Sequence, residues 1–295
     1  MPTFYNFREN GLDYSFDDIF VPADSLLARD GNLFIWGTAS NGRLGNGATT
    51  GNISTPVTTF AGGTNWKQVS CMSLESTVAI KTDGTLWTWG RNDRSQLGNA
   101  GITDRSTPVT TFAGGTNWKQ VNTGGTHIAA IKTDGTLWTW GDGSFGQLGH
   151  NTTTNSYTPV TTFAGGTNWK QVSGGDNHCA AIKIDGTLWT WGIGTSGQLG
   201  NNAATDRSTP VTTFAGGTNW KQVSAGNIHC AAIKTDGTLW IWGQGSDGRL
   251  GDNTVTSKST PVTTFSGGTN WKQVSSGINF FGSCAAVTYI DSVLL

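Results

Sequence analysis

Charged residues are scarce in this chain. Its 295 residues include 19 acidic and 18 basic side chains, which leave a formal net charge of −1. A protein that binds nucleic acid or an anionic membrane through its charge needs a marked basic excess. We therefore expect neither a nucleic-acid partner nor membrane insertion. The low charge also argues against a helical protein, whose surface normally carries more Glu and Lys.

Long apolar runs, a secretory leader and clustered cysteines are missing as well. No apolar run approaches the roughly 18 residues that a membrane-spanning helix requires. The opening residues MPTFYNFREN contain no basic stretch followed by an apolar one, so we expect no cleaved signal peptide. No C-x-x-C spacing occurs, and we interpret all the cysteines as free thiols rather than as a disulfide or zinc framework. They are Cys71, Cys179, Cys230 and Cys284.

Glycine and tryptophan are abundant, with 43 and 14 residues, and they recur at a regular interval. The heptapeptide GTLWTWG stands at 84–90, 135–141 and 186–192, with the variants GNLFIWG at 31–37 and GTLWIWG at 237–243. TPVTTF begins at 55, 107, 158, 209 and 260, and NWKQV at 65, 117, 168, 219 and 270. Successive copies lie about 51 residues apart, which indicates a repeat architecture of five full units from about Asp30 onward.

Each unit predicts four short strands. An apolar run such as AAIK (129–132) meets the hairpin signal Asp-Gly and then TLWTWG. A Gly- and Asn-rich loop follows, then TPVTTF as a strand opened by Pro, the turn AGGTN, and the strand WKQVS. Four antiparallel strands per unit of this length are typical of a β-propeller blade, so the predicted fold is an all-β propeller. The tryptophans then form the contacts between blades.

These residues resemble the regulator-of-chromosome-condensation repeat family. The resemblance is carried by LWTWG, by GQLG at 146–149 and 197–200, by TPV, and by WKQVSAGNIHCAAIKTDG at 220–237. It covers nearly everything from Asp30 onward and implies a propeller, which in that family commonly has seven blades. This chain has five full units plus half-units at 17–31 and 284–295. Two outcomes stay open: closure with five blades and one strand left over, or a sixth irregular blade built from both termini.

The resemblance also implies one candidate activity, because the family's eponymous members promote nucleotide exchange on a small GTPase at chromatin. Features of those members are missing here. Residues 1–29 carry five acidic residues and only two basic ones, Arg8 and Arg29, so there is no basic chromatin-binding arm. No unit contains a long insertion that could reach into a GTPase.

Motifs that could carry chemistry have plainer interpretations. Three G-x-G-x-x-G matches, at 141–146, 192–197 and 243–248, recur with the repeat and precede turns rather than the helix that a dinucleotide site needs. His127, His178 and His229 share one repeat position, where we expect each to hydrogen-bond a local turn rather than a metal. Cysteines follow the last two histidines directly, but adjacent strand residues point to opposite faces. We expect no catalytic residue, no metal, no cofactor and no enzymatic activity.

Variation among the units is concentrated between WG and TPV, at 38–54, 91–106, 142–157, 193–208 and 244–259. A constant scaffold with changing loops is typical of a binding surface. The alternative is that these loops have drifted without use. The exposed partner-binding candidates are Arg91, Asp93, Arg94, Phe145, His150, Tyr157, Ile193 and Asp247.

The first 29 residues form a separate segment ahead of the repeat region 30–295. Its aromatic residues are Phe4, Tyr5, Phe7, Tyr14, Phe16 and Phe20. That density is unusual for a disordered leader, so we expect these side chains to bury against a partner subunit or the propeller edge. The alternative is an edge strand that closes the ring.

The sequence therefore favours a non-enzymatic structural or interaction propeller with protein partners; it leaves a homo-oligomer open. Near-identical repeats with low charge resemble repeat proteins carried by tailed bacteriophages. That resemblance implies a virion component, in the tail or on the capsid, that binds a host surface or neighbouring virion proteins. Two alternatives are a regulator of a small GTPase and a glycan-binding, lectin-like propeller.

Overall fold

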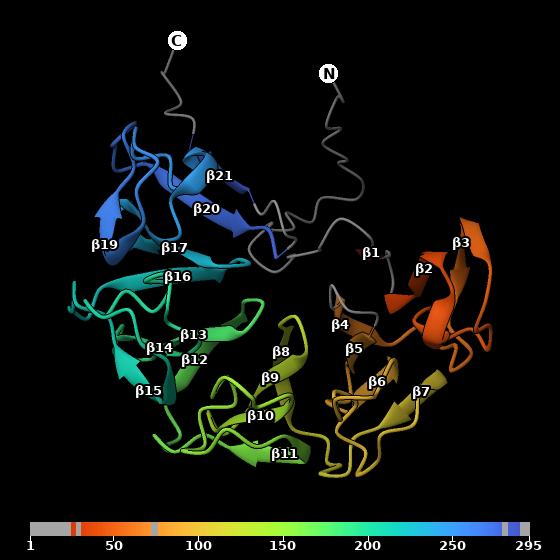
Figure 1. The fold of residues 1–295 in the computed structure, drawn as a ribbon. Coiled ribbons are helices and arrows are strands. Elements are labelled where there is room, and N and C mark those ends of the chain that lie inside the picture. Colours follow the sequence, from red (N-terminus) through yellow and green to blue (C-terminus); the bar gives the residue numbers. More distant parts are fainter. Residues whose placement is uncertain (1–24, 28–30, 72–75, 279–282, 290–295) are drawn as a thin grey trace.

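The computed structural model consists of antiparallel sheets arranged radially around a central axis (Figure 1). It describes residues 25–27, 31–71, 76–278 and 283–289. Within these ranges, the complete helical elements are the 3₁₀ turns Ser40–Gly42 and Ser246–Gly248. The WKQV strands lie innermost and the TPVT strands outermost in each complete sheet. The predicted all-β propeller is confirmed.

The described strands form four complete sheets and two partial ones. The first, partial sheet contains β1 (Ser25–Leu27), β2 (Leu33–Thr38) and β3 (Asn52–Thr58). The second sheet contains β4 (Trp66–Cys71), β5 (Ser76–Lys81), β6 (Leu86–Gly90) and β7 (Arg105–Thr110), and the third contains β8 (Trp118–Thr123), β9 (His127–Lys132), β10 (Leu137–Gly141) and β11 (Ser156–Thr161). The fourth contains β12 (Trp169–Gly174), β13 (His178–Lys183), β14 (Leu188–Gly192) and β15 (Arg207–Thr212), and the fifth contains β16 (Trp220–Ala225), β17 (His229–Lys234), β18 (Leu239–Gly243) and β19 (Lys258–Thr263). The last, partial sheet contains β20 (Trp271–Ser276) and β21 (Cys284–Thr288).

The sequence repeat and the sheet are out of phase by one strand. A repeat unit begins with an AAIK strand, whereas a sheet begins with the WKQV strand at the end of the preceding unit. Five units therefore give four complete sheets among the described residues. The first sheet lacks an innermost strand, and the last one lacks its two outer strands.

The TPVTTF strands do not open at proline, as the sequence suggested. In the second sheet, β7 begins at Arg105, and Pro108 lies in its middle. Pairing between β6 and β7 is irregular between Thr88 and Gly90, opposite this proline. The prediction was wrong because it did not consider that this strand is the outermost one of its sheet. Proline cannot donate to a sheet, but the outermost strand has a free edge and tolerates the missing N–H.

The core lies between neighbouring sheets and is built on indoles. Trp66 of β4 makes edge-to-face contacts with Trp87 and Trp89 of β6, with ring centroids 6.4 and 6.1 Å apart. Trp89 is fully buried, and its Nε1 donates a hydrogen bond to the Arg43 carbonyl of the preceding sheet at 2.9 Å. Burial of one such ring stabilises the fold by about 2–3 kcal/mol. Repetition of the ring therefore repeats the interface.

Glutamines join the innermost strands around the axis. The Gln68 side chain donates to the Val121 carbonyl at 2.9 Å and accepts from the Val121 N–H at 3.1 Å. This amide therefore bonds to the β8 backbone in the way that a neighbouring strand would. The same pair of bonds joins Gln120 to Val172, Gln171 to Val223 and Gln222 to Val274.

Candidate interaction surfaces

The variable loops leave their sheets at equivalent points and contact the next sheet. The loop after β10 reaches across so that the Asn151 N–H donates to the Ser208 carbonyl at 2.8 Å. Gly146 (φ +76°) packs its backbone against Ser208, where a Cβ would lie 2.7 Å from the Ser208 Cα. The last glycine of this G-x-G-x-x-G match thus serves packing between sheets.

Most of the loop residues predicted to be exposed are exposed. Phe145 and Tyr157 are accessible, the latter at 52% of its surface, and Asp247 is exposed although it pairs with Arg249 at 3.0 Å. Arg94 is also open to solvent and lies 3.5 Å from Asp142. Acidic and basic groups alternate on this surface, which suits protein recognition better than binding of a uniformly charged polymer.

Three of the predicted loop residues are less accessible than expected. Arg91 is only partly exposed and forms an ion pair with Asp93 at 2.7 Å, whereas Asp93 itself is exposed. His150 and Ile193 are half-buried. Burial lowers the pKa of His150. The expectation of full exposure at these positions was wrong because the loops fold back onto neighbouring sheets.

The second predicted surface lies outside the described residues. All of its aromatic residues, from Phe4 to Phe20, belong to the segment 1–24. Their burial against a partner or against the propeller edge stays a prediction.

Sequence reasoning missed a ring of exposed phenylalanines. The Phe that closes each TPVTTF motif follows the outermost strand and has 65 to 75% of its surface exposed; these residues are Phe60, Phe112, Phe163, Phe214 and Phe265. No position in the fold was assigned to these side chains from the sequence. The available signal was the turn directly after each Phe, AGG in four units and SGG in the last, because residues at the end of an outermost strand face solvent.

The axis contains an open channel of about 530 Å³. Its lining includes the glutamine ladder and the side chains of Lys67, Lys119 and Lys170. No acidic residue of the described chain lines it. Like charges that converge without counter-charge raise the local positive potential.

Histidines and cysteines pair between sheets, which the sequence did not predict. The Nε2 of His127 lies 2.9 Å from the Sγ of Cys179, and His178 and His229 approach Cys230 and Cys284 in the same way at 3.1 Å. The expected bond to a local turn was therefore wrong. The residue adjacent in sequence is not the partner; the cysteine one repeat later is.

These pairs are unsuited to catalysis. Burial lowers the pKa of His127 to about 4 and that of His178 to about 3, and it raises the pKa of the Cys179 thiol. Both groups are therefore neutral near pH 7, and a neutral thiol is a poor nucleophile. Within the described ranges, no group of three or more His, Cys, Asp or Glu side chains is arranged to hold a metal ion. No helix in that part of the chain is long and apolar enough to cross a membrane.

Comparison with known sequences places these features in context. The family model of the RCC1-like domain matches residues 23–282. The chain is 34% identical over 206 residues to the ultraviolet-B receptor UVR8 of Arabidopsis thaliana, which covers 68% of this chain and 47% of UVR8. It is 29% identical over 248 residues to the human E3 ubiquitin-protein ligase HERC2, which covers 80% of this chain and 5% of HERC2. The chain thus spans less than half the length of these relatives.

Solved structures show the same fold. Human WBSCR16 superposes with a TM-score of 0.76 at 22% identity, and the match covers 89% of this chain and 68% of that one. Yeast RCC1 (Prp20), solved bound to Kap60, gives a TM-score of 0.74 at 21% identity over 89% of this chain and 65% of that one. These likenesses show a shared fold, and the matches cover about two thirds of each of those chains.

Proposed function

This chain belongs to the RCC1-like domain family, and from that premise we propose that it is a non-enzymatic propeller that recognises a protein partner through its variable loops. The main support for this proposal is the contrast between near-constant blades and exposed loops that change from unit to unit. Rigid blades hold those loops in a defined order, which lowers the entropy that binding would otherwise cost.

The relatives support a role in protein interaction. Yeast RCC1 has been solved bound to Kap60, and Prp20p of Saccharomyces cerevisiae is described with binding properties to Gsp1p and histones. HERC2 is named a ubiquitin ligase, yet the matched region is only 5% of its length. The buried, neutral His–Cys pairs are poor nucleophiles, and no group of three or more His, Cys, Asp or Glu side chains is arranged to hold a metal ion in the described part of the chain.

One experiment addresses the loop surface directly. The triple variant Asp93→Ala, Arg94→Ala, Phe145→Ala removes exposed loop groups. The control Ile184→Thr removes an exposed apolar side chain at the opposite end of a hairpin and installs the residue that other units carry there. In quantitative affinity capture from source cells, proteins retained by wild type and by the control should be lost by the triple variant. Equal retention by all three proteins would reject the loops as the recognition surface.

The GTPase alternative has its own test. Purified Gsp1p and histones are suitable probes, since Prp20p is described as binding both. Accelerated nucleotide release from Gsp1p by the chain would favour the regulator over a passive binding module. A glycan array tests the lectin alternative in the same way.

The narrower proposal of a virion component rests on composition: near-identical repeats, low charge and few ionisable groups. Attachment through the aromatic segment 1–29 belongs to this proposal, with residues 30–295 as the propeller. Deletion of residues 1–20 should then abolish assembly into large particles while circular dichroism and thermal unfolding of the propeller stay unchanged. Normal assembly of the truncated protein would reject it.

A further inference from the structure

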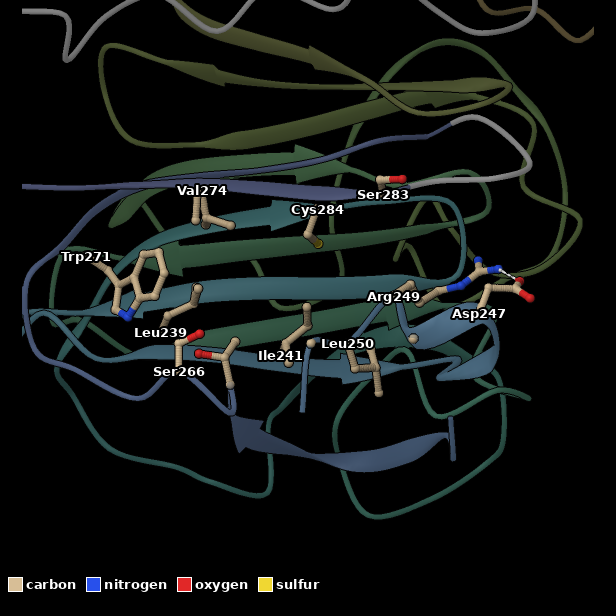
Figure 2. Close-up of a pocket in the computed structure, with 14 residues that line it drawn as sticks. Leu239, Ile241, Asp247, Arg249, Leu250, Ser266, Trp271, Val274, Ser283 and Cys284 are labelled. Carbon is tan, nitrogen blue, oxygen red and sulfur yellow. Dashed lines mark hydrogen bonds and ion pairs between the residues drawn. The ribbon is translucent and has the colours of Figure 1, made fainter. Parts of the chain in front are cut away.

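An apolar cavity of about 450 Å³ lies between the fifth and sixth sheets (Figure 2). Leu239 and Ile241 of β18 line one side of it, Trp271 and Val274 of β20 line the other, and Cys284 of β21 lies at its margin. At one end, Arg249 and Asp247 form an ion pair at 3.0 Å. An apolar lining beside unpaired strands suits a hydrophobic side chain.

The four preceding interfaces hold an indole at this position. Each has a loop that ends in Leu-Gly, and the Cβ position of that glycine lies 2.7 to 2.8 Å from a tryptophan of the next sheet. The indole Nε1 donates to the carbonyl two residues before the glycine at 2.9 to 3.0 Å. The pairs are Gly45 with Trp89, Gly98 with Trp140, Gly149 with Trp191, and Gly200 with Trp242. At the fifth position, the Cβ of Gly251 would meet nothing within 4 Å. We call this place the indole socket; it consists of Arg249, Leu250, Gly251, Leu239, Ile241 and Trp271.

A second glycine series is interrupted at the same place. Gly146 and Gly197 pack against Ser208 and Ser259 of the following sheet, but Gly248 has nothing within 4 Å. Trp271 also lacks the two edge-to-face indole contacts that Trp66, for example, makes within its own sheet. Both observations indicate that the sixth sheet is missing the strand that carries the socket's tryptophan.

The first sheet holds a strand with the matching residue. In β2, LFIWG aligns with LWTWG, so Trp36 stands where Trp89 and Trp140 stand in complete sheets. Those two tryptophans are fully buried, whereas Trp36 is partly exposed, and the described residues provide no hydrogen-bond partner for its Nε1. Gly37 likewise has nothing within 4 Å of its Cβ position, although its counterpart Gly141 is packed against the strand beside it.

We propose that the indole socket is the binding site for Trp36, and that β2–β3 of the same chain is its occupant. In this arrangement β2 pairs with the free edge of β21 instead of with β1, and the Trp36 Nε1 donates to the Arg249 carbonyl. The sheet β20–β21–β2–β3 then has four strands like the others. The ring closes with five blades, and β1 is the strand left over.

Three observations favour the same chain as the occupant. Figure 1 shows the first and sixth sheets on either side of the break in the ring, with the two partial sheets facing that break. Each of the five blades then contains one strand of every type, and the sixth AAIK-type strand, β1, is left over. Val287 of β21 is 57% exposed, and a free strand edge with exposed apolar residues gains stability when it is paired. A tethered strand also has a higher effective concentration than one from a second copy.

Paired cysteines test which strand lies beside β2. In a complete sheet, Trp240 of β18 lies opposite Ala232 of β17, so closure places Phe34 opposite Ala286. The described pairing instead places Phe34 opposite Leu26 of β1. The variant Phe34→Cys, Ala286→Cys should form an intramolecular disulfide under mild oxidation, because directly opposite strand residues come within bonding range. The matched variant Phe34→Cys, Leu26→Cys should form far less.

Non-reducing electrophoresis and peptide mass spectrometry give the readout. A disulfide between positions 34 and 286 within one chain supports the proposal. Preferential bonding between 34 and 26 overturns it, and so does a 34–286 bond that joins two chains, which would make a second copy the occupant.

Hydrogen exchange gives an independent test that does not depend on introduced thiols. In the wild-type protein, closure protects the amides of β21, and Trp36→Ala should speed their exchange by at least about tenfold while β9 amides are unaffected. Trp36→Phe keeps the apolar bulk without the Nε1 donor and should give an intermediate rate. Equal β21 exchange in wild type and Trp36→Ala would overturn the proposal.

Discussion

The imidazole of His127 contacts a cysteine in the neighbouring sheet, Cys179, with Nε2 and Sγ 2.9 Å apart. The contact repeats at the next two interfaces, where His178 meets Cys230 and His229 meets Cys284. Each pair spans a boundary between sheets, so it adds to the apolar contacts, the indole hydrogen bonds and the glutamine bonds that hold neighbouring blades together. His127 and Cys179 are both buried, so loss of one leaves the other without a hydrogen bond.

Replacement of Cys179 by Ala should therefore lower the free energy of unfolding by about 1–3 kcal/mol, through the unpaired His127 Nε2 and the small cavity left behind. Urea unfolding monitored by tryptophan fluorescence provides the measurement. Cys71→Ala is the matched control, since Cys71 is only half-buried and accepts a hydrogen bond from the Thr77 hydroxyl. A loss at Cys179 no larger than the loss at Cys71 would contradict a role for the His–Cys pair.

The same histidines make stability depend on pH. Burial lowers the pKa of His127 and His229 to about 4 and that of His178 to about 3, from 6.5. The unfolded chain therefore binds more protons than the folded one below pH 6.5. The free energy of unfolding is therefore not reduced by these histidines above pH 6.5. It falls as the pH drops from 6.5 toward 4, by at most about 1.4 kcal/mol per pH unit for each histidine.

Unfolding titrations between pH 7 and 4.5 measure this slope. The triple variant His127→Gln, His178→Gln, His229→Gln removes the titrating groups, so its stability should vary less with pH over that window. Carboxylates contribute in both proteins and cancel in the comparison. An unchanged slope in the triple variant would show that these histidines do not titrate on unfolding.

Much of the fold could be predicted from the sequence because each repeat contains the local signals for its own strands and turns. Asp-Gly turns and the alternation in TLWTWG predicted hairpins, and the copied tryptophans predicted contacts between blades. The phase between repeat and sheet could not be predicted, because a repeat in sequence has no intrinsic starting strand. The β1 and β21 half-units made the terminal sheets ambiguous for the same reason.

The interaction surfaces were predicted less completely. Phe145, Tyr157 and Asp247 were correctly expected to be exposed, since changing loops usually face solvent. The exposed ring that includes Phe112 was missed, because attention went to the variable loops and this Phe belongs to a nearly constant motif. The partner of His127 was missed too, because contacts between residues about 50 positions apart depend on the closure of neighbouring sheets, which no local pattern encodes.

The glycines that follow Leu in the variable loops should resist substitution. Gly98 has φ +61°, and a Cβ there would lie 2.7 Å from the Trp140 ring. Gly98→Ala should therefore destabilise the protein by more than backbone strain alone, which is about 1 kcal/mol. Gly114→Ala is the matched control, because Gly114 has φ +54° but open space around its Cβ position. Thermal unfolding of both variants separates strain from the clash, and equal losses would mean that the indole moves aside freely.

The glutamine ladder should stabilise the contact between innermost strands. Gln120→Ala removes a donor to the Val172 carbonyl at 3.4 Å and an acceptor for the Val172 N–H at 3.2 Å, so we expect a loss of about 1–2 kcal/mol in the free energy of unfolding. Gln120→Glu keeps the acceptor and loses the donor, and should fall between the wild type and the alanine variant. Chemical denaturation measures both. Lys119→Ala, at the neighbouring exposed residue, should not lower stability.

The lysines that line the axis should destabilise the folded protein at low salt. Lys67, Lys119 and Lys170 line one channel that contains no acidic residue of the described chain, so their charges repel one another. The triple variant Lys67→Gln, Lys119→Gln, Lys170→Gln should raise the unfolding temperature at low ionic strength, and the gain should shrink as salt screens the wild-type repulsion. Lys258→Gln is the informative control, because Lys258 lies 3.5 Å from Asp252, and its loss should lower stability instead. Thermal unfolding at two salt concentrations distinguishes the cases. A gain in the triple variant that persists at high salt would point to packing rather than charge as its cause, because screening acts on the Coulomb contribution alone.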